Sequence, residues 1–301
     1  MRLFLSIIAP IILFIPANPA VHQLTTSGDD LNPCWSPDGS EIVFESLRTI
    51  PRNIWVMNAD GTNQHNVSNS SYGDWNPEFS PDGSKIAFNS DRFVEGVGDI
   101  YTMLSNGGDV TRLTTTYHDL YPTWSPDGDY IAYEHGGPPT VTNIWKIPST
   151  GGIGIQLTFG DYDDWDPAWS PDGNKIAFDS NRFGAGSQIY TMSPNGQNIV
   201  KIVDEGVRPC WSPDSTKIAY CYYNSEYHWN IFVVPAVGGT PQQITFFTDL
   251  GCTDTSWSPD GTKIVFGHED DWSNSNIWYV DVDLDINVEP ASLGQIKANY
   301  K

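Results

Sequence analysis

The stretch Trp35-Ser36-Pro37-Asp38-Gly39 returns along the chain, and its repetition decides the fold. Close copies begin at Phe79, Trp124, Trp169, Trp211 and Trp257, and their prolines at 37, 81, 126, 171, 213 and 259 are spaced by 42 to 46 residues. Pro presets φ, Asp caps a turn and Gly adopts positive φ, so each copy predicts a tight turn. A period of about 40–45 residues with several short strands is typical of a β-propeller blade.

One repeat shows how a blade is expected to form. Residues 74–80 predict a first strand, the turn follows, and residues 85–90 alternate polar and apolar side chains as a second strand. Residues 99–103 and 111–114 predict the third and fourth strands. The aromatic residue that opens each copy is expected to pack between neighbouring blades.

A count of the outer strands predicts how the ring closes. A Leu-Thr-type outer strand at 23–25 precedes the first copy, and no such strand follows the last blade's third strand at 276–280. We therefore expect an all-β, six-bladed β-propeller of four-stranded antiparallel blades, with the N-terminal strand closing the last blade.

The ends of the chain lie outside this repeat. Residues 1–20 combine a basic start, an apolar run and small residues, which predicts a cleavable secretory signal peptide. The propeller is expected over 21–280 and a C-terminal tail over 281–301, with a short helix at 292–300. The mature protein is expected to be periplasmic or secreted, without a membrane span and monomeric.

The charge of the chain limits its partners. The formal net charge is -22, which disfavours nucleic acid and anionic membranes, since both attract Lys and Arg. An acidic surface that keeps the protein soluble explains this charge, and so does a face that attracts a basic protein or peptide.

The four cysteines predict at most one disulfide. Cys34 and Cys210 occupy the same repeat position two sites apart in the ring, too far apart for a bond. Cys221 and Cys252 are expected at adjacent loop ends and form the one plausible pair, although four reduced thiols are an equal alternative. Their spacing does not indicate a zinc site.

The repeat resembles a known family. Pro-x-Trp-Ser-Pro-Asp-Gly-x-x-Ile-Ala-Phe-x-Ser-x-Arg, followed by Ile-Trp/Tyr-x-Met and Leu-Thr, is similar to the TolB-type six-bladed propeller over about residues 21–280. Related blades occur in the prolyl oligopeptidase group, tricorn-like proteases and oligogalacturonate lyase. The resemblance implies an exported propeller that binds a protein.

The candidate binding residues lie on the longer loops, which a propeller places on the face opposite its tight turns. Several of these loops carry aromatic, acidic or histidine side chains outside the repeat pattern, which suit contact with a protein or a sugar. Gap filling between loops is the alternative. The candidates are Trp75, His118, Asp119, Tyr162, Asp164, Trp165, His228, Trp229 and Trp272.

A second set of loop residues recurs with the repeat. Asp30 and Asp74 lie three residues before Pro33 and Pro77. The arginines Arg48, Arg92 and Arg182 each follow the second strand of their repeat. We expect these residues to brace the loops, and a site for a cation is the alternative. The repeats without this arginine instead carry histidines at 135, 228 and 268, but we predict no metal site and no cofactor.

The sequence favours a binding protein over an enzyme. It contains no Gly-x-Ser-x-Gly elbow, and no second domain that would house one is apparent. We expect a non-catalytic protein-binding or peptide-binding module that uses the long-loop face around the central channel. The alternative is a polysaccharide-active enzyme resembling a metal-assisted lyase, or a lectin, on the same face.

Overall fold

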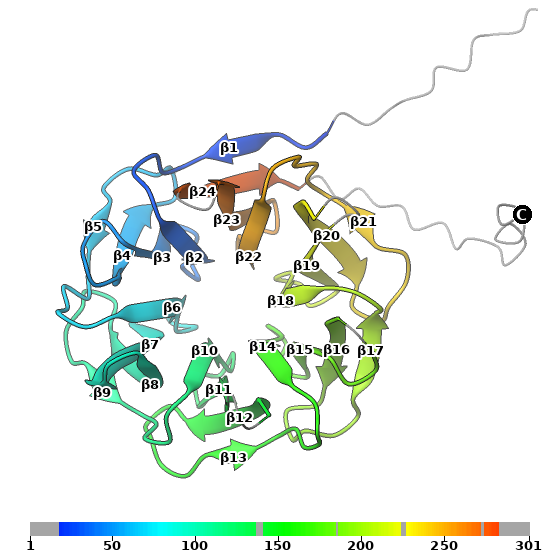
Figure 1. Ribbon diagram of the computed structural model, residues 1–301, viewed down its shortest axis with the longest axis horizontal. Helices are drawn as coiled ribbons and strands as arrows, with labels where there is room; N and C mark the ends of the chain where they lie inside the picture. The colour runs from blue at the N-terminus through cyan, green and yellow to red at the C-terminus, as the bar shows by residue number, and fades with distance from the viewer. Residues whose placement is uncertain (1–17, 137–140, 185, 224–226, 272–273, 283–301) are drawn as a thin grey trace, which may run out of the picture.

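The computed structural model describes residues 18–136, 141–184, 186–223, 227–271 and 274–282, and every regular element in them is a β-strand. Figure 1 shows the sheets arranged in a ring, with β2, β6, β10, β14, β18 and β22 nearest its centre. The predicted signal peptide at 1–20 falls almost wholly outside the described residues, and so does nearly all of the tail at 281–301. No helix in the described part of the chain could cross a membrane.

Four sheets are separate four-stranded antiparallel blades. The first contains β2 (Asp30–Trp35), β3 (Glu41–Ser46), β4 (Asn53–Asn58) and β5 (His65–Asn66), and the second contains β6 (Asp74–Phe79), β7 (Lys85–Val94), β8 (Val97–Leu104) and β9 (Thr111–Arg112). The third contains β10 (Asp119–Trp124), β11 (Tyr130–His135), β12 (Asn143–Pro148) and β13 (Ile155–Gln156), and the fourth contains β14 (Asp164–Trp169), β15 (Ile176–Ser180), β16 (Gln188–Met192) and β17 (Val200–Val203).

The remaining described strands form one eight-stranded sheet. One half contains β18 (Val207–Trp211), β19 (Lys217–Tyr223), β20 (Trp229–Pro235) and β21 (Gln242–Gln243), and the other contains β22 (Gly251–Trp257), β23 (Lys263–Asp271), β24 (Asn274–Asp281) and β1 (Val21–Gln23). The prediction of a six-bladed propeller is therefore wrong, because strand pairing in the described chain gives four four-stranded blades and this larger sheet.

A single backbone contact joins the two halves of that sheet. Trp229 pairs in parallel with Gly251, and the Trp229 N–H donates to the Leu250 carbonyl at 3.1 Å. A Cβ on Gly251 would lie 1.9 Å from the Trp229 carbonyl oxygen, so glycine is needed for this close approach. The sequence pattern did not reveal the contact because it involves only one residue on each strand.

The tight turns are held by the aspartate of each repeat. In the first copy, the Asp38 carboxylate accepts hydrogen bonds from the Ser36 hydroxyl and the Ser40 N–H, and Gly39 has a φ of 73°. The hydrogen bonds from Ser40 and Ser36 lower the pKa of Asp38 to about 2. These turns define the tight-turn face of the ring, and the loops at the other strand ends define the long-loop face.

The core lies between neighbouring sheets. Phe44, Phe88, Phe178 and Phe266 occupy the same position on the second strands and are all fully buried. Of the aromatic residues that open the copies, Trp35, Phe79, Trp124, Trp211 and Trp257 are buried, and Trp169 packs partly buried against a core cluster. This confirms the predicted packing between neighbouring sheets.

The strand β1 occupies the place that an outer strand takes in the other sheets. It runs antiparallel to β24, and the Thr25 hydroxyl beyond it accepts a hydrogen bond from the Ile277 N–H at 2.9 Å. Thr114 and Thr158 accept the same bond from Ile100 and Ile144. The first and last strands therefore share one sheet and its hydrogen bonds.

The Thr25→Val variant is expected to lower the free energy of unfolding by about 1–3 kcal/mol, because it leaves the buried Ile277 N–H without an acceptor. Urea unfolding of the purified protein measures this change. Thr26→Val is the matched control, since the Thr26 side chain is exposed. Equal stability of the two variants would show that the hydrogen bond between Thr25 and Ile277 does not stabilise the closure of the ring.

Candidate functional site at the channel mouth

A bulge interrupts each inner strand and carries one residue to the central channel. The register shifts in all of these strands, and the residue within each shift has positive φ and lines the channel. Positive φ is uncommon for residues other than glycine and is maintained by surrounding structure. We call these residues the bulge ring: Asn32, Asn76, Tyr121, Asp166, Arg208 and Asp254.

Acidic side chains on the second strands hold several of these bulges. Glu45 accepts a hydrogen bond from the Asn76 N–H at 2.7 Å, and Glu134 accepts one from the Asp166 N–H at 3.3 Å. Asp179 accepts one from the Arg208 N–H at 3.2 Å. Each bond joins one inner strand to the second strand of the preceding repeat, so these carboxyl groups have a structural role close to the channel.

Burial perturbs the acids of this region. It raises the pKa of Glu134 to about 8, with a further contribution from the charge of Asp166, and it raises the pKa of Asp179 to about 6. Burial and the Asp179 charge also raise the pKa of Asp166. The site therefore changes its charge across the neutral pH range.

Among the described residues that line the channel and its mouth, Arg208 is the only one with a cationic side chain. Its Nε lies 3.2 Å from Asp254 Oδ1 and 4.0 Å from Asp166 Oδ2. The charge of Asp254 raises the pKa of Arg208 well above its usual value. A third of the Arg208 side chain is exposed, so the ion pair faces the channel.

A cavity of about 510 Å³ lies above the bulge ring on the long-loop side. Tyr121, Asp166 and Arg208 form its boundary with the channel below, and Trp165 and Trp229 contribute aromatic surface to its walls. An aromatic wall with a few polar groups at the base is the usual form of a ligand site. The arrangement suits binding of a group that carries both charge and apolar surface.

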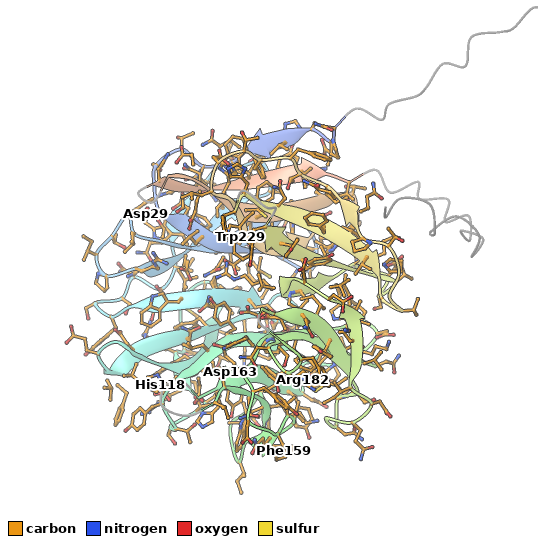
Figure 2. All side chains as sticks on the ribbon, turned by 45° about the vertical axis from the view of Figure 1, so that its right-hand side comes forward. Asp29, His118, Phe159, Asp163, Arg182 and Trp229 are labelled. Atoms are coloured by element: carbon orange, nitrogen blue, oxygen red, sulfur yellow. The ribbon has the colours of Figure 1, made fainter. Side chains whose placement is uncertain are left out.

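Exposed aromatic side chains lie on the long-loop face. Every exposed Phe or Tyr of the described residues lies on a loop or strand end of the long-loop face, and we call this set the aromatic rim. On the tight-turn face the exposed large apolar residues are aliphatic, such as Ile153 and Val237. The rim consists of Tyr72, Phe93, Tyr117, Phe159, Phe183, Tyr223, Tyr227 and Phe246. In Figure 2, Phe159 lies at the lower margin and Trp229 nearer the middle of the molecule.

The aspartates and arginines expected to brace loops form buried ion pairs. Arg48 lies 2.5 Å from Asp30, Arg92 lies 2.8 Å from Asp74, and Arg182 lies 2.6 Å from Asp164. All three aspartate side chains are fully buried. The guanidinium of Arg182 also stacks on Tyr162 at 4.7 Å and on Tyr190 at 4.8 Å.

The structure separates the other predicted binding residues. Trp165 and Trp229 both line the cavity, whereas Asp119 is fully buried with His135 at 2.6 Å and Asp164 is buried with Arg182. His118 is exposed, and Trp75 and His228 are partly buried. Trp272 lies outside the described residues. Among the described residues, no group of three His, Cys, Asp or Glu side chains is arranged to hold a metal ion.

The bulge ring and the acids that hold it were not singled out from the sequence. Asp166, two residues beyond the predicted Asp164, is the aspartate that reaches the channel. A signal was present, since all but the last member of the ring immediately precede a proline, as in Asp166-Pro167 and Arg208-Pro209. Alignment of the repeats on that proline would have placed these residues in one set.

The fold and its channel define a β-propeller of four-stranded antiparallel blades with a candidate ligand site at its axis. The family model described as TolB beta propeller domain matches residues 20–142 and 140–283. The chain belongs to this family, which confirms the resemblance to a TolB-type propeller but not the six blades that were expected.

Solved structures show the same fold. The putative TolB from Agrobacterium tumefaciens is 24% identical, with a TM-score of 0.72 over 87% of this chain and 97% of that one. TolB from Acinetobacter baumannii is 18% identical, with a TM-score of 0.64 over 85% of this chain and 64% of that one. An oligogalacturonate lyase in complex with manganese is 14% identical, with a TM-score of 0.61 over 88% and 93%. No curated protein matches the sequence.

The Arg182→Ala variant is expected to lose about 3–5 kcal/mol of stability, because it leaves the buried Asp164 carboxylate unpaired. Thermal and urea unfolding measure the loss. Lys201→Ala removes the exposed partner of Asp204 and is expected to change stability little. Similar effects of the two changes would show that the buried pair does not brace the loops.

Stability is expected to fall as pH rises through the neutral range. The folded protein keeps a proton on Glu134 up to about pH 8, whereas unfolded Glu134 releases it near pH 4.5, so the folded state binds more protons between these values. Urea unfolding at several pH values within this range measures the slope, and Glu134→Gln should make it less steep. Glu95→Gln, at an exposed loop position, is the control. An unchanged slope in Glu134→Gln would contradict the assignment.

Proposed function

We propose that this protein is a non-catalytic module that binds a protein or peptide on the long-loop face around the channel, without a cofactor. The observation that carries the proposal is the segregation of every exposed Phe and Tyr of the described chain to that face. Aromatic side chains are enriched at protein interfaces because they bury large apolar areas at low entropic cost. The cavity at the centre would receive one anchoring side chain of the partner.

The partner is basic in this proposal. The net charge is -22, and four carboxyl groups line the cavity beside the one guanidinium of Arg208, so the cavity becomes more acidic as Glu134, Asp166 and Asp179 release their protons with rising pH. This charge attracts a cationic segment, and Trp165 and Trp229 suit contact with a cation at their ring faces. Charge attraction of this kind weakens as salt is added.

We also propose that the protein acts outside the cytoplasm. The sequence features of residues 1–20 favour export, and we infer a periplasmic or secreted protein that acts as a monomer on an envelope or extracellular partner.

Binding to immobilised peptide libraries sorted by net charge tests this function. Basic peptides are expected to be retained, with an affinity that falls as the salt concentration rises. Trp229→Ala should weaken the binding of a retained peptide by roughly 2 kcal/mol or more, since the Trp229 side chain lines the cavity. Fluorescence anisotropy of the labelled peptide measures the change.

Exposed apolar residues on opposite faces provide the matched controls. Phe159→Ala on the aromatic rim should weaken the binding of the same peptide, and Ile153→Ala on the tight-turn face should leave its binding unchanged. Retention of acidic peptides only, or a hydrogen-exchange footprint on the tight turns, would contradict the proposed face.

A second candidate, a polysaccharide-active enzyme or lectin on the same face, is favoured by one observation. The carboxyl groups of Asp166 and Asp179 share a hydrogen bond beside the cavity, and paired carboxyl groups can serve as general acid and base. The acidic charge disfavours uronate polymers, which are anionic. Ultraviolet detection of unsaturated product from oligogalacturonate, with and without manganese, and a glycan array test this candidate. Product formation abolished by Asp179→Asn would favour it over peptide binding.

A further inference from the structure

We propose that Cys221 and Cys252 are a disulfide-forming site that ties together the two halves of the eight-stranded sheet. Their sulfur atoms lie 3.4 Å apart, although the residues are 31 positions apart in sequence. A disulfide has an S–S distance of about 2.05 Å, so the sulfur atoms are already in contact and need only a short approach.

The remaining cysteines have other neighbours. The Cys34 thiol donates to the Trp35 carbonyl at 3.5 Å, and the Cys210 sulfur lies 3.1 Å from the Thr255 hydroxyl. Both residues are on inner strands, β2 and β18. All four cysteines are free, and the one sulfur–sulfur contact found among them joins Cys221 to Cys252. The geometry therefore selects one pairing.

Because of where Cys221 and Cys252 lie, a disulfide between them would affect the cavity at the channel mouth. Cys221 lies on β19 in one half of the sheet, and Cys252 lies on β22 in the other half. Cys252 directly follows Gly251, whose backbone pairing with Trp229 is the contact that joins the halves. Both cysteines also line the cavity at the channel mouth. A covalent bond here would fix the joint between the halves and one wall of the cavity.

The bond would form by thiol–disulfide exchange with a small disulfide such as oxidised glutathione. One cysteine thiolate attacks the glutathione disulfide, forms a mixed disulfide and releases one glutathione thiolate. The second cysteine thiolate then attacks the mixed disulfide and releases the other. The protein loses two electrons and two protons, and oxidised glutathione becomes two molecules of the reduced thiol.

The burial of the pair determines when the reaction is fastest. Each residue is 1% exposed, and burial raises the pKa of Cys252 well above its usual value. Because the thiolate is the reacting form, the folded reduced protein should react slowly. The bond should form more readily while the chain folds and the thiols are accessible.

Refolding of the full chain from the reduced, denatured state with oxidised glutathione tests the proposal. Two of the four thiols are expected to disappear in a titration under denaturing conditions, and non-reducing peptide mapping should find Cys221 joined to Cys252. Chain crosslinks restrict the unfolded state, so later reduction should lower the melting temperature by about 5–10 °C.

Serine variants supply matched controls. Cys34→Ser and Cys210→Ser should retain the crosslinked peptide and the drop in melting temperature on reduction, whereas Cys221→Ser and Cys252→Ser should lose both. If either latter variant does not fold, the thiol titration and peptide map of the unchanged protein still decide the question. Four titratable thiols after oxidative refolding, or a bond that includes Cys34 or Cys210, would overturn the proposal.

Discussion

Burial of both faces of every sheet is the constraint on which this molecule depends. A sheet of four short strands cannot stabilise itself in water, because both of its faces would remain wet. Here the central phenylalanine of the second strand, as in Phe88 and Phe178, is fully enclosed by the strands of its own and the neighbouring sheets. The ring arrangement provides a neighbour for each sheet and leaves the strand ends free to form two faces.

The two faces differ because one is formed by tight turns and the other by longer loops, which are stabilised in different ways. The tight turns are short, and their aspartates are committed to hydrogen bonds within the turn, as at Asp38. The longer loops are fixed at their base by buried ion pairs such as Asp74 with Arg92. Loops that are held in this manner can present aromatic side chains to the solvent without loss of their shape.

The features of this structure that could be predicted from the sequence are those that interactions within a single repeat determine. Strand alternation, the Pro-Asp-Gly turns and the packing of Trp35 and its equivalents follow from rules that act within one repeat. The joint at Trp229 and Gly251 depends on a single backbone approach, so the periodic pattern gave no sign of it. Asp164 was predicted as a binding residue and Asp166 was not singled out from the acidic residues around it, because a β-bulge changes which residue faces the channel and has no glycine to mark it.

The bulge ring separates the choice of side chain from the demands of folding. Its backbone positions are fixed by register shifts and by bonds to main-chain N–H groups, while the ring side chains line the channel rather than a packed core. Amide, phenol, carboxylate and guanidinium groups all occupy equivalent places in one molecule. A substitution at Asn32 or Asn76 would therefore change the channel lining alone, whereas Arg208, Asp166 and Asp254 are linked by charge and would have to change together.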